Sequence, residues 1–259
     1  MIIEETNEIK AANFLFDLRK DNNLFHSLSF DTISAIGPNA AMPHYRVNKN
    51  SNLNFANDTI YLFDSGGQYR DGTTDITRTI IIGKPTKEQK DRFTRVLKGH
   101  IALAEIEFDP GTRGSQIDPF ARQSLLEIGC NYDHGTGHGI GSFLSVHEGP
   151  QKISKFQGQS DGILKEGMIL SNEPGYYKTG EYGIRIENLI IVIPKKNSKK
   201  LKFETITWAP IDIDLIEVSL LSQKEKNWIN DYHNKVYEKI SPNLHKEQKD
   251  WLLLVTAPL

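Results

Sequence analysis

Acidic and imidazole side chains stand at four places in this chain where the surrounding residues are apolar or rich in glycine. Asp64 ends one apolar run and Asp75 begins another. The pairs Gly66-Gly67 and Asp71-Gly72 mark a turn between them, so a hairpin would bring the two carboxylates side by side. Facing carboxylates repel each other unless a positive charge lies between them, and a metal ion is the simplest such charge. The alternative is that Asp64 and Asp71 are ordinary turn residues, as Asp beside Gly usually is.

Three of the eight histidines of the chain, His134, His138 and His147, fall in a glycine-rich segment, residues 134–150. Glycines flank His138 on both sides, so little side-chain bulk prevents a close approach of the backbone there. A single histidine is more often structural than a ligand, but three histidines in such a segment favour a functional role. The alternative is a flexible surface loop.

Two further acidic residues complete the group. Glu173 follows an apolar strand and precedes a Pro-Gly break. In residues 183–188, strand alternation places Arg185 and Glu187 on one face, although an Arg–Glu pair of this kind is also common on protein surfaces. Together the segments offer four carboxylates and one imidazole, an oxygen-rich set that suits Mn²⁺, Co²⁺ or Fe²⁺ better than a structural zinc. Two ions bridged by shared carboxylates would need about this many ligands and could activate water for hydrolysis.

The elements that must position these residues mix helices with strands. Helical spacing and capping boxes predict helices that begin near Thr6, Thr86 and Ser222, and a further helix over residues 117–128. Apolar and β-branched runs predict strands within residues 27–36, 59–63, 76–82, 168–171, 183–192 and 201–207. An apolar tail, residues 251–255, is expected to pack back onto the body. This order predicts an α+β fold with antiparallel hairpins rather than a doubly wound sheet.

Composition excludes several classes of protein. The 259 residues carry 31 Lys+Arg and 33 Asp+Glu, and 38% are hydrophobic, so the chain is neither disordered nor basic enough for nucleic acid. We expect no nucleic-acid partner and, since no apolar run is long enough to span a bilayer, no membrane partner. The single cysteine, Cys130, excludes an internal disulfide and a cysteine-based zinc site. Residues 1–5 do not resemble a signal peptide, so we expect a cytoplasmic protein.

The motifs, in this order, resemble the catalytic domain of aminopeptidase P, the Xaa-Pro aminopeptidases of peptidase family M24. The likeness runs from about residue 27 to the C-terminus and is closest to the cytosolic, three-domain type. The matching segments are residues 37–39, 43–45, 64–69, 71–75, 134–139, 146–150, 172–177 and 183–188. The resemblance implies the pita-bread fold, a mainly antiparallel curved sheet flanked by helices.

The resemblance also implies a set of metal ligands. These are Asp64, Asp75, His138, Glu173 and Glu187. Asp64 would chelate one ion, Asp75 and Glu187 would bridge both, and His138 and Glu173 would complete the second. Two divalent ions per chain are therefore expected, with Mn²⁺ first and Co²⁺, Zn²⁺ or Fe²⁺ as other ions that such ligands accept.

The activity implied is removal of the N-terminal residue from peptides that have a free N-terminus and proline second. A metal-bridging hydroxide would attack the carbonyl before proline, and Glu173 would shuttle the proton. His147 and His44 would donate hydrogen bonds to the carbonyl oxygen. The residues implied to bind substrate are His44, His134, His138, His147, Glu173 and Arg185.

We expect residues 1–259 to form a single catalytic domain, with about 208–259 as a C-terminal extension that packs on it, and without the N-terminal domains of the longer relatives. The resemblance further implies a homodimer. Two alternatives remain: a truncated, inactive pita-bread protein, or another hydrolase of this fold such as a prolidase-like dipeptidase or a methionine aminopeptidase. The five retained ligand positions argue against the first alternative, and the segment 135–137 favours aminopeptidase P over the second.

Overall fold

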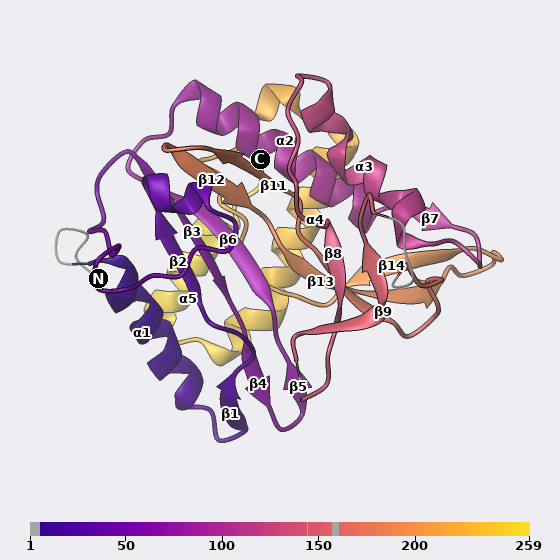
Figure 1. Ribbon diagram of the computed structural model, residues 1–259, viewed down its shortest axis with the longest axis horizontal. Helices are drawn as coiled ribbons and strands as arrows, with labels where there is room; N and C mark the ends of the chain where they lie inside the picture. The colour runs from indigo at the N-terminus through magenta and orange to yellow at the C-terminus, as the bar shows by residue number, and fades with distance from the viewer. Residues whose placement is uncertain (1–5, 144, 157–160) are drawn as a thin grey trace.

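The fold was analysed on a computed structural model that describes residues 6–143, 145–156 and 161–259 (Figure 1). The start of the chain, where the sequence predicts no signal peptide, lies outside these residues. The helices are α1 (Glu8–Lys20), η2 (Gly37–Ala41), α2 (Lys87–Ala104), α3 (Gly114–Leu126), η3 (Val218–Leu220), α4 (Gln223–Ile240), η4 (Ser241–Asn243) and α5 (Lys246–Val255). The strands are β1 (Phe25–Leu28), β2 (Ile33–Ile36), β3 (Thr59–Ser65), β4 (Gly67–Tyr69), β5 (Gly72–Thr73), β6 (Ile76–Ile82), β7 (Glu107–Phe108), β8 (Gly137–Ile140), β9 (His147–Ile153), β10 (Ile169–Asn172), β11 (Gly175–Lys178), β12 (Tyr182–Arg185), β13 (Asn188–Pro194) and β14 (Leu201–Thr205).

The strands of the described residues pair antiparallel in four sheets, which confirms the predicted α+β class. The strand orders are β1-β4-β5, β2-β3-β6, β11-β12 and β7-β14-β13-β10-β8-β9. β3 and β6 pair in register from Thr59 opposite Ile82 to Ser65 opposite Ile76. This ladder places Asp64 opposite Thr77 and leaves Asp75 directly before β6, so both acidic residues reach the same end of the sheet.

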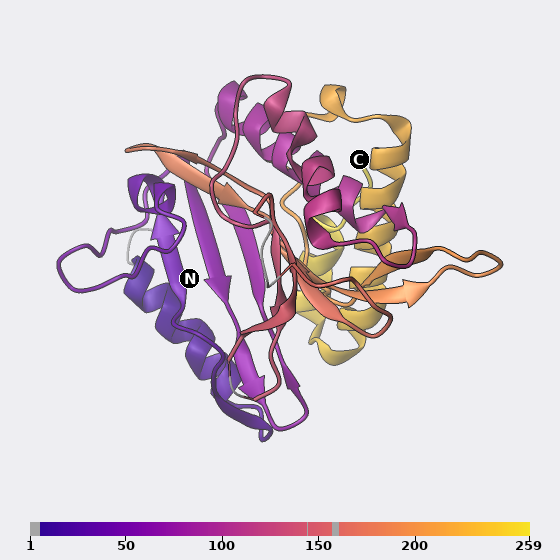
Figure 2. The same ribbon diagram turned by 45° about the vertical axis from the view of Figure 1, so that its right-hand side comes forward.

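The helices cover the sheets on different sides. Figure 2 shows α2, α3 and α4 gathered on one side, while α1 lies along β1 and β2 at the opposite edge. Helix α2 begins with the predicted capping box of Thr86 and Gln89, and its Phe93 and Leu97 enter the main core. That core also contains residues of β12 and α4. In α3, Phe120 is 47% exposed although the helical pattern predicts it on the buried face.

The predicted strand over residues 183–192 is instead two strands, β12 and β13. β12 pairs with β11, whereas β13 pairs with β10, so the chain passes from one sheet to another at Ile186 and Glu187. Alternation of apolar residues does not reveal this change of partner, because β12 and the first residues of β13 are all buried. Glu187 therefore lies at a junction between two sheets rather than within a strand.

The C-terminal residues pack on the main core through one side of a helix only. The expected apolar tail is part of helix α5, in which Leu252 is buried while Trp251, Leu253 and Leu254 are more than half exposed. A helix presents only one face to the body, so most of these apolar side chains face outward. In the described part of the chain, no helix combines the length and apolar character that a membrane crossing requires.

Candidate active site

All nine side chains that the sequence analysis singled out line one cavity of about 370 Å³. They are Asp64, Asp75, Glu173, Glu187, His44, His134, His138, His147 and Arg185. Seven of them lie in strands or directly beside strand ends, whereas His44 lies in the turn after η2 and His134 in the loop before β8. Apolar residues, Phe30, Ile33, Pro43 and Val146, complete the lining.

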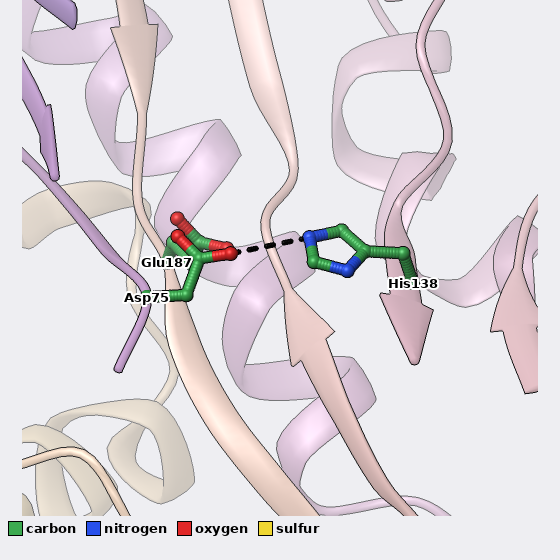
Figure 3. Close-up of side chains that lie close together, drawn as sticks. All are labelled: Asp75, His138 and Glu187. Atoms are coloured by element: carbon green, nitrogen blue, oxygen red, sulfur yellow. Dashed lines mark ion pairs between the residues drawn. The ribbon is translucent and has the colours of Figure 1, made fainter. Parts of the chain in front are cut away.

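Asp75, His138 and Glu187 form the tightest group in this cavity. One possible ligand atom from each lies within 4.8 Å of the other two, and the Asp75 Oδ2 to His138 Nε2 distance is 3.3 Å. Figure 3 shows the two carboxylates side by side and directed at the imidazole of His138. Glu187 accepts a 2.7 Å hydrogen bond from the hydroxyl of Thr77, which leaves its other oxygen available. Two carboxylates and an imidazole at this spacing form a candidate cation site.

Arg185 binds only one of the two carboxylate oxygens of Asp64. The Arg185 guanidinium donates to Asp64 Oδ2 at 2.7 Å, whereas Asp64 Oδ1 is buried and has no hydrogen-bond partner. Arg185 also donates through Nε to the hydroxyl of Thr77, at 3.1 Å, and so supports Glu187 through Thr77. A buried carboxylate oxygen without a partner is costly, and a bound cation would satisfy it.

Glu173 lies on the other side of the imidazole. Its Oε1 is 3.5 Å from His138 Nε2, and its Oε2 is 4.0 Å from Arg185 Nε. The hydroxyl of Ser171 donates to Glu173 at 2.9 Å and accepts the backbone N–H of His138 at 3.0 Å. Ser171 thus fixes Glu173 relative to His138. The Glu173 side chain is 18% exposed, so it can reach a molecule in the cavity.

The other three histidines surround this centre. His134 donates from Nδ1 to the Gly135 carbonyl at 2.7 Å, so its Nε2 accepts the hydroxyl of Tyr177 at 2.8 Å. The Tyr177 oxygen in turn accepts from Arg185 at 2.7 Å. The His147 ring packs edge-on against His138 at 4.2 Å, and His44 lies exposed at the cavity wall.

The glycines beside His138 allow two strands to approach closely. A Cβ atom on Gly137 would lie 2.0 Å from the Ser171 carbonyl oxygen, and one on Gly139 would lie 1.9 Å from the Glu148 carbonyl oxygen. Neither contact is compatible with a side chain. The predicted close backbone approach around His138 is therefore confirmed.

Burial and mutual repulsion dominate the electrostatics of the site. Burial raises the pKa of Asp64 to about 6 and that of Glu173 to about 7, and it raises the pKa of Glu187 well above its usual range. Burial alone would lower the pKa of His138, but the hydrogen bond to Asp75 and the charge of Glu173 outweigh it and raise this pKa to about 9. Four acidic groups thus share one guanidinium and one imidazole. This surplus of carboxylates, with the unpaired oxygen of Asp64, fits divalent cations.

Two family profiles match this chain. A profile described as metallopeptidase family M24 matches residues 1–194. This chain belongs to metallopeptidase family M24. A second profile, for the C-terminal region of M24 peptidases, matches residues 199–259.

Relatives of this M24 chain support the same conclusion. It is 47% identical, over 99% of its length, to a "Probable Xaa-Pro aminopeptidase P" of Coprinopsis cinerea, and 47% identical, over 98%, to one of Arthroderma gypseum. The chain spans about two-fifths of the length of these relatives, 42% and 41%.

Solved structures agree with the predicted pita-bread fold, which is confirmed. An X-prolyl aminopeptidase from Caenorhabditis elegans, described as a cytosolic enzyme with a di-nuclear active site, matches with a TM-score of 0.92 at 39% identity, over 98% of this M24 chain and 43% of its own. A prolidase from Pyrococcus furiosus matches with a TM-score of 0.69 at 30% identity, over 79% of this chain and 56% of its own.

Sequence reasoning assigned no role to three residues of the site: Thr77, Ser171 and Tyr177. Thr77 stands two positions after Asp75 and Ser171 two positions before Glu173, so strand alternation would have placed each near its acidic neighbour. Tyr177 belongs to the strand that follows Glu173, and its contact with His134 joins segments that no local pattern relates.

Proposed function

We propose that this M24 chain is the catalytic part of a two-metal aminopeptidase that removes the N-terminal residue from peptides with proline second. The observation that carries the proposal is the convergence of Asp64, Asp75, His138, Glu173 and Glu187 on one cavity. The similarity to proteins named Xaa-Pro aminopeptidase over nearly the whole chain supports the same substrate class. We assign the five residues as ligands of two divalent ions, Mn²⁺ first.

In this proposal the ions supply Lewis acidity and a nucleophile at neutral pH. Asp75 and Glu187 would be the ligands shared by both ions, because their carboxylates lie side by side (Figure 3). Asp64 would hold one ion through the oxygen that has no hydrogen-bond partner, and His138 and Glu173 would hold the other. Arg185 fixes Asp64 directly and Glu187 through Thr77.

Proton transfer falls to Glu173. Its carboxylate is the partly exposed one of the group, so it would take the proton that the attacking water loses and pass it to the leaving nitrogen. His147 and His44 face the same cavity, and burial lowers the pKa of each, so both are neutral at pH 7 and donate one N–H. We assign these N–H groups to the substrate carbonyl oxygen as it gains charge.

Substrate selection follows from the chemistry of the cavity and of proline. The free α-amine of the substrate lies beside Asp64, which makes the activity exopeptidic. Proline in the second position has no amide N–H, so it can lie against apolar side chains without leaving a donor unpaired. The apolar lining formed by Phe30, Ile33, Pro43 and Val146 suits its ring.

The second candidate function is a prolidase-like dipeptidase, because solved prolidases share this fold at about 30% identity. Peptide length separates the two functions. We would load the metal-stripped chain with Mn²⁺ and offer it a dipeptide and a tripeptide with proline second, the N-acetylated tripeptide, and a tripeptide with alanine second. Cleavage of the free tripeptide with proline, but not of the acetylated or alanine peptide, supports the aminopeptidase. Cleavage of the dipeptide alone supports the prolidase.

The proposal also covers the cellular location of the protein and its oligomeric state. We propose a cytoplasmic protein, supported by the description of the Caenorhabditis elegans relative as cytosolic. The homodimer stays a prediction, which the mass of the chain in solution tests. Trp228 of α4 stacks on Tyr232 and contacts the ring of His100, so its described contacts belong to the core.

A further inference from the structure

Two asparagines are the sequence neighbours of two carboxylates of the site. Asn172 and Asn188 face each other across the β10–β13 pair, and both are fully buried. Asn172 immediately precedes Glu173, and Asn188 immediately follows Glu187. Any shift of this asparagine pair would therefore change the spacing of the two carboxylates.

The imidazole of His100, a fully buried residue of α2, joins both asparagines. Its Nδ1 lies 3.1 Å from the Asn172 carbonyl oxygen, and its Nε2 lies 3.2 Å from Asn188 Nδ2. Asn172 returns a hydrogen bond from its side-chain amide to the His100 carbonyl at 2.9 Å. One residue of α2 is thereby tied to both strands that end at the site.

The hydrogen bond from Arg78 indicates which atoms of this network donate and which accept. Arg78 is only a donor, and it donates to Asn188 Oδ1 at 2.7 Å, so Asn188 Nδ2 faces His100. His100 Nε2 must then be the acceptor, and the hydrogen on Nδ1 is donated to the Asn172 carbonyl. The neutral ring with its hydrogen on Nδ1 satisfies both contacts at once.

From this arrangement we propose that His100 is a positioning residue: by binding Asn172 and Asn188 it holds Glu173 and Glu187 at the spacing that binding of the two ions would require. The inference rests on the proposed metal site. His100 lines no part of the cavity, so it acts through the asparagines and not on the substrate. Residues that orient ligands from outside typically change metal affinity about 10–100-fold when they are replaced.

The test compares His100→Phe with His233→Phe. His233 is also fully buried, but its Nε2 accepts the backbone N–H of Ile211, away from the ligands. We would titrate each metal-stripped protein with Mn²⁺ by calorimetry and record the paramagnetic resonance spectrum of the loaded protein, in which two neighbouring Mn²⁺ ions give an exchange-coupled signal.

His100→Phe is expected to bind Mn²⁺ about 10–100-fold more weakly and to lose or alter the coupled signal, while His233→Phe keeps the wild-type affinity and signal. His100→Asn can place an amide N–H near the position of Nδ1, toward the Asn172 carbonyl, but has no atom at the position of Nε2, which contacts Asn188, so an intermediate affinity is expected. This variant decides the question if His100→Phe does not fold. Wild-type affinity and signal in either His100 variant, or an equal loss in His233→Phe, would overturn the inference. If the wild-type protein does not bind two neighbouring Mn²⁺ ions, the proposed function itself would be overturned.

Discussion

The hydroxyl of Thr77 donates a 2.7 Å hydrogen bond to the carboxylate of Glu187, 110 positions further along the chain. The backbone repeats the connection, because the Glu187 N–H donates to the Thr77 carbonyl at 3.1 Å. The start of β6 and the junction between β12 and β13 are thus joined at the centre of the site. Since Arg185 donates to the same hydroxyl, Thr77 also connects Glu187 to the residue that holds Asp64.

Replacing Thr77 by valine tests this connection. Valine keeps the shape but leaves the buried Glu187 without its donor, so we expect a loss of about 1–3 kcal/mol in the free energy of unfolding and weaker Mn²⁺ binding. Thr94→Val is the control, because Thr94 is equally buried but accepts the backbone N–H of Glu217. Chemical denaturation and Mn²⁺ titration would be measured on both. Equal Mn²⁺ affinity in the two variants would contradict the role of Thr77.

Glu173→Gln tests the proton shuttle. The amide keeps the size of the side chain but cannot accept a proton, so kcat is expected to fall by about 10²–10⁴-fold. Glu88→Gln serves as the control, because Glu88 pairs with Lys178 and Tyr182 outside the cavity, and its kcat should remain unchanged. Steady-state cleavage of a tripeptide with proline second gives both values. A Glu173→Gln protein with the wild-type kcat is incompatible with the mechanism.

Mn²⁺ affinity is expected to increase with pH. Without ions, burial raises the pKa of Asp64 to about 6 and that of Glu173 to about 7, and the neighbouring carboxylates raise the pKa of His138 to about 9 against the effect of burial. Each group must lose its proton to become a ligand, so binding releases protons between about pH 6 and pH 9. Calorimetry in buffers of different ionisation enthalpy measures this release. A pH-independent affinity over that range would show that these groups are not ligands.

Acid is expected to destabilise the fold through His233. Burial lowers the pKa of His233 to about 4, below its ordinary value of 6.5, so the unfolded chain binds the proton first as the pH falls. The stability from the neutral ring is complete above about pH 6.5 and is lost as the pH falls toward 4. His233→Gln cannot titrate, so its stability should depend less on pH across this window, with a difference of a few kcal/mol since each pKa unit corresponds to about 1.36 kcal/mol. Identical pH slopes for the two proteins in denaturant unfolding would refute this assignment.

Much of the architecture could be predicted because it depends on local patterns. The helix face of α2 and the capping boxes at Thr86 and Ser222 depend on residues three or four positions apart, which a sequence displays directly. The β3–β6 hairpin likewise follows from turn residues between two apolar runs. In contrast, the break at Glu187 and the exposure of Trp251 depend on which partner a strand or helix meets, and local patterns do not specify that partner.

The candidate site likewise contains residues that sequence patterns predict and residues that they do not. The nine predicted side chains line one cavity. Eight of them were found because charged and imidazole groups beside glycines or strand ends are unusual, whereas His44 was implied by the family resemblance alone. The residues that hold them are ordinary ones: a threonine, a serine, a tyrosine and a histidine within a helix. His100 in particular appears in sequence as one polar residue of an amphipathic helix, and only the pairing of β10 with β13 gives it two asparagine partners.

The central claim, that five residues hold two ions in this cavity, is tested most directly by anomalous X-ray diffraction from crystals of the Mn²⁺-loaded protein. The account predicts two anomalous peaks, with the carboxylates of Asp75 and Glu187 between them, Asp64 beside one peak, and His138 and Glu173 beside the other. A single peak, or peaks away from these side chains, would contradict it.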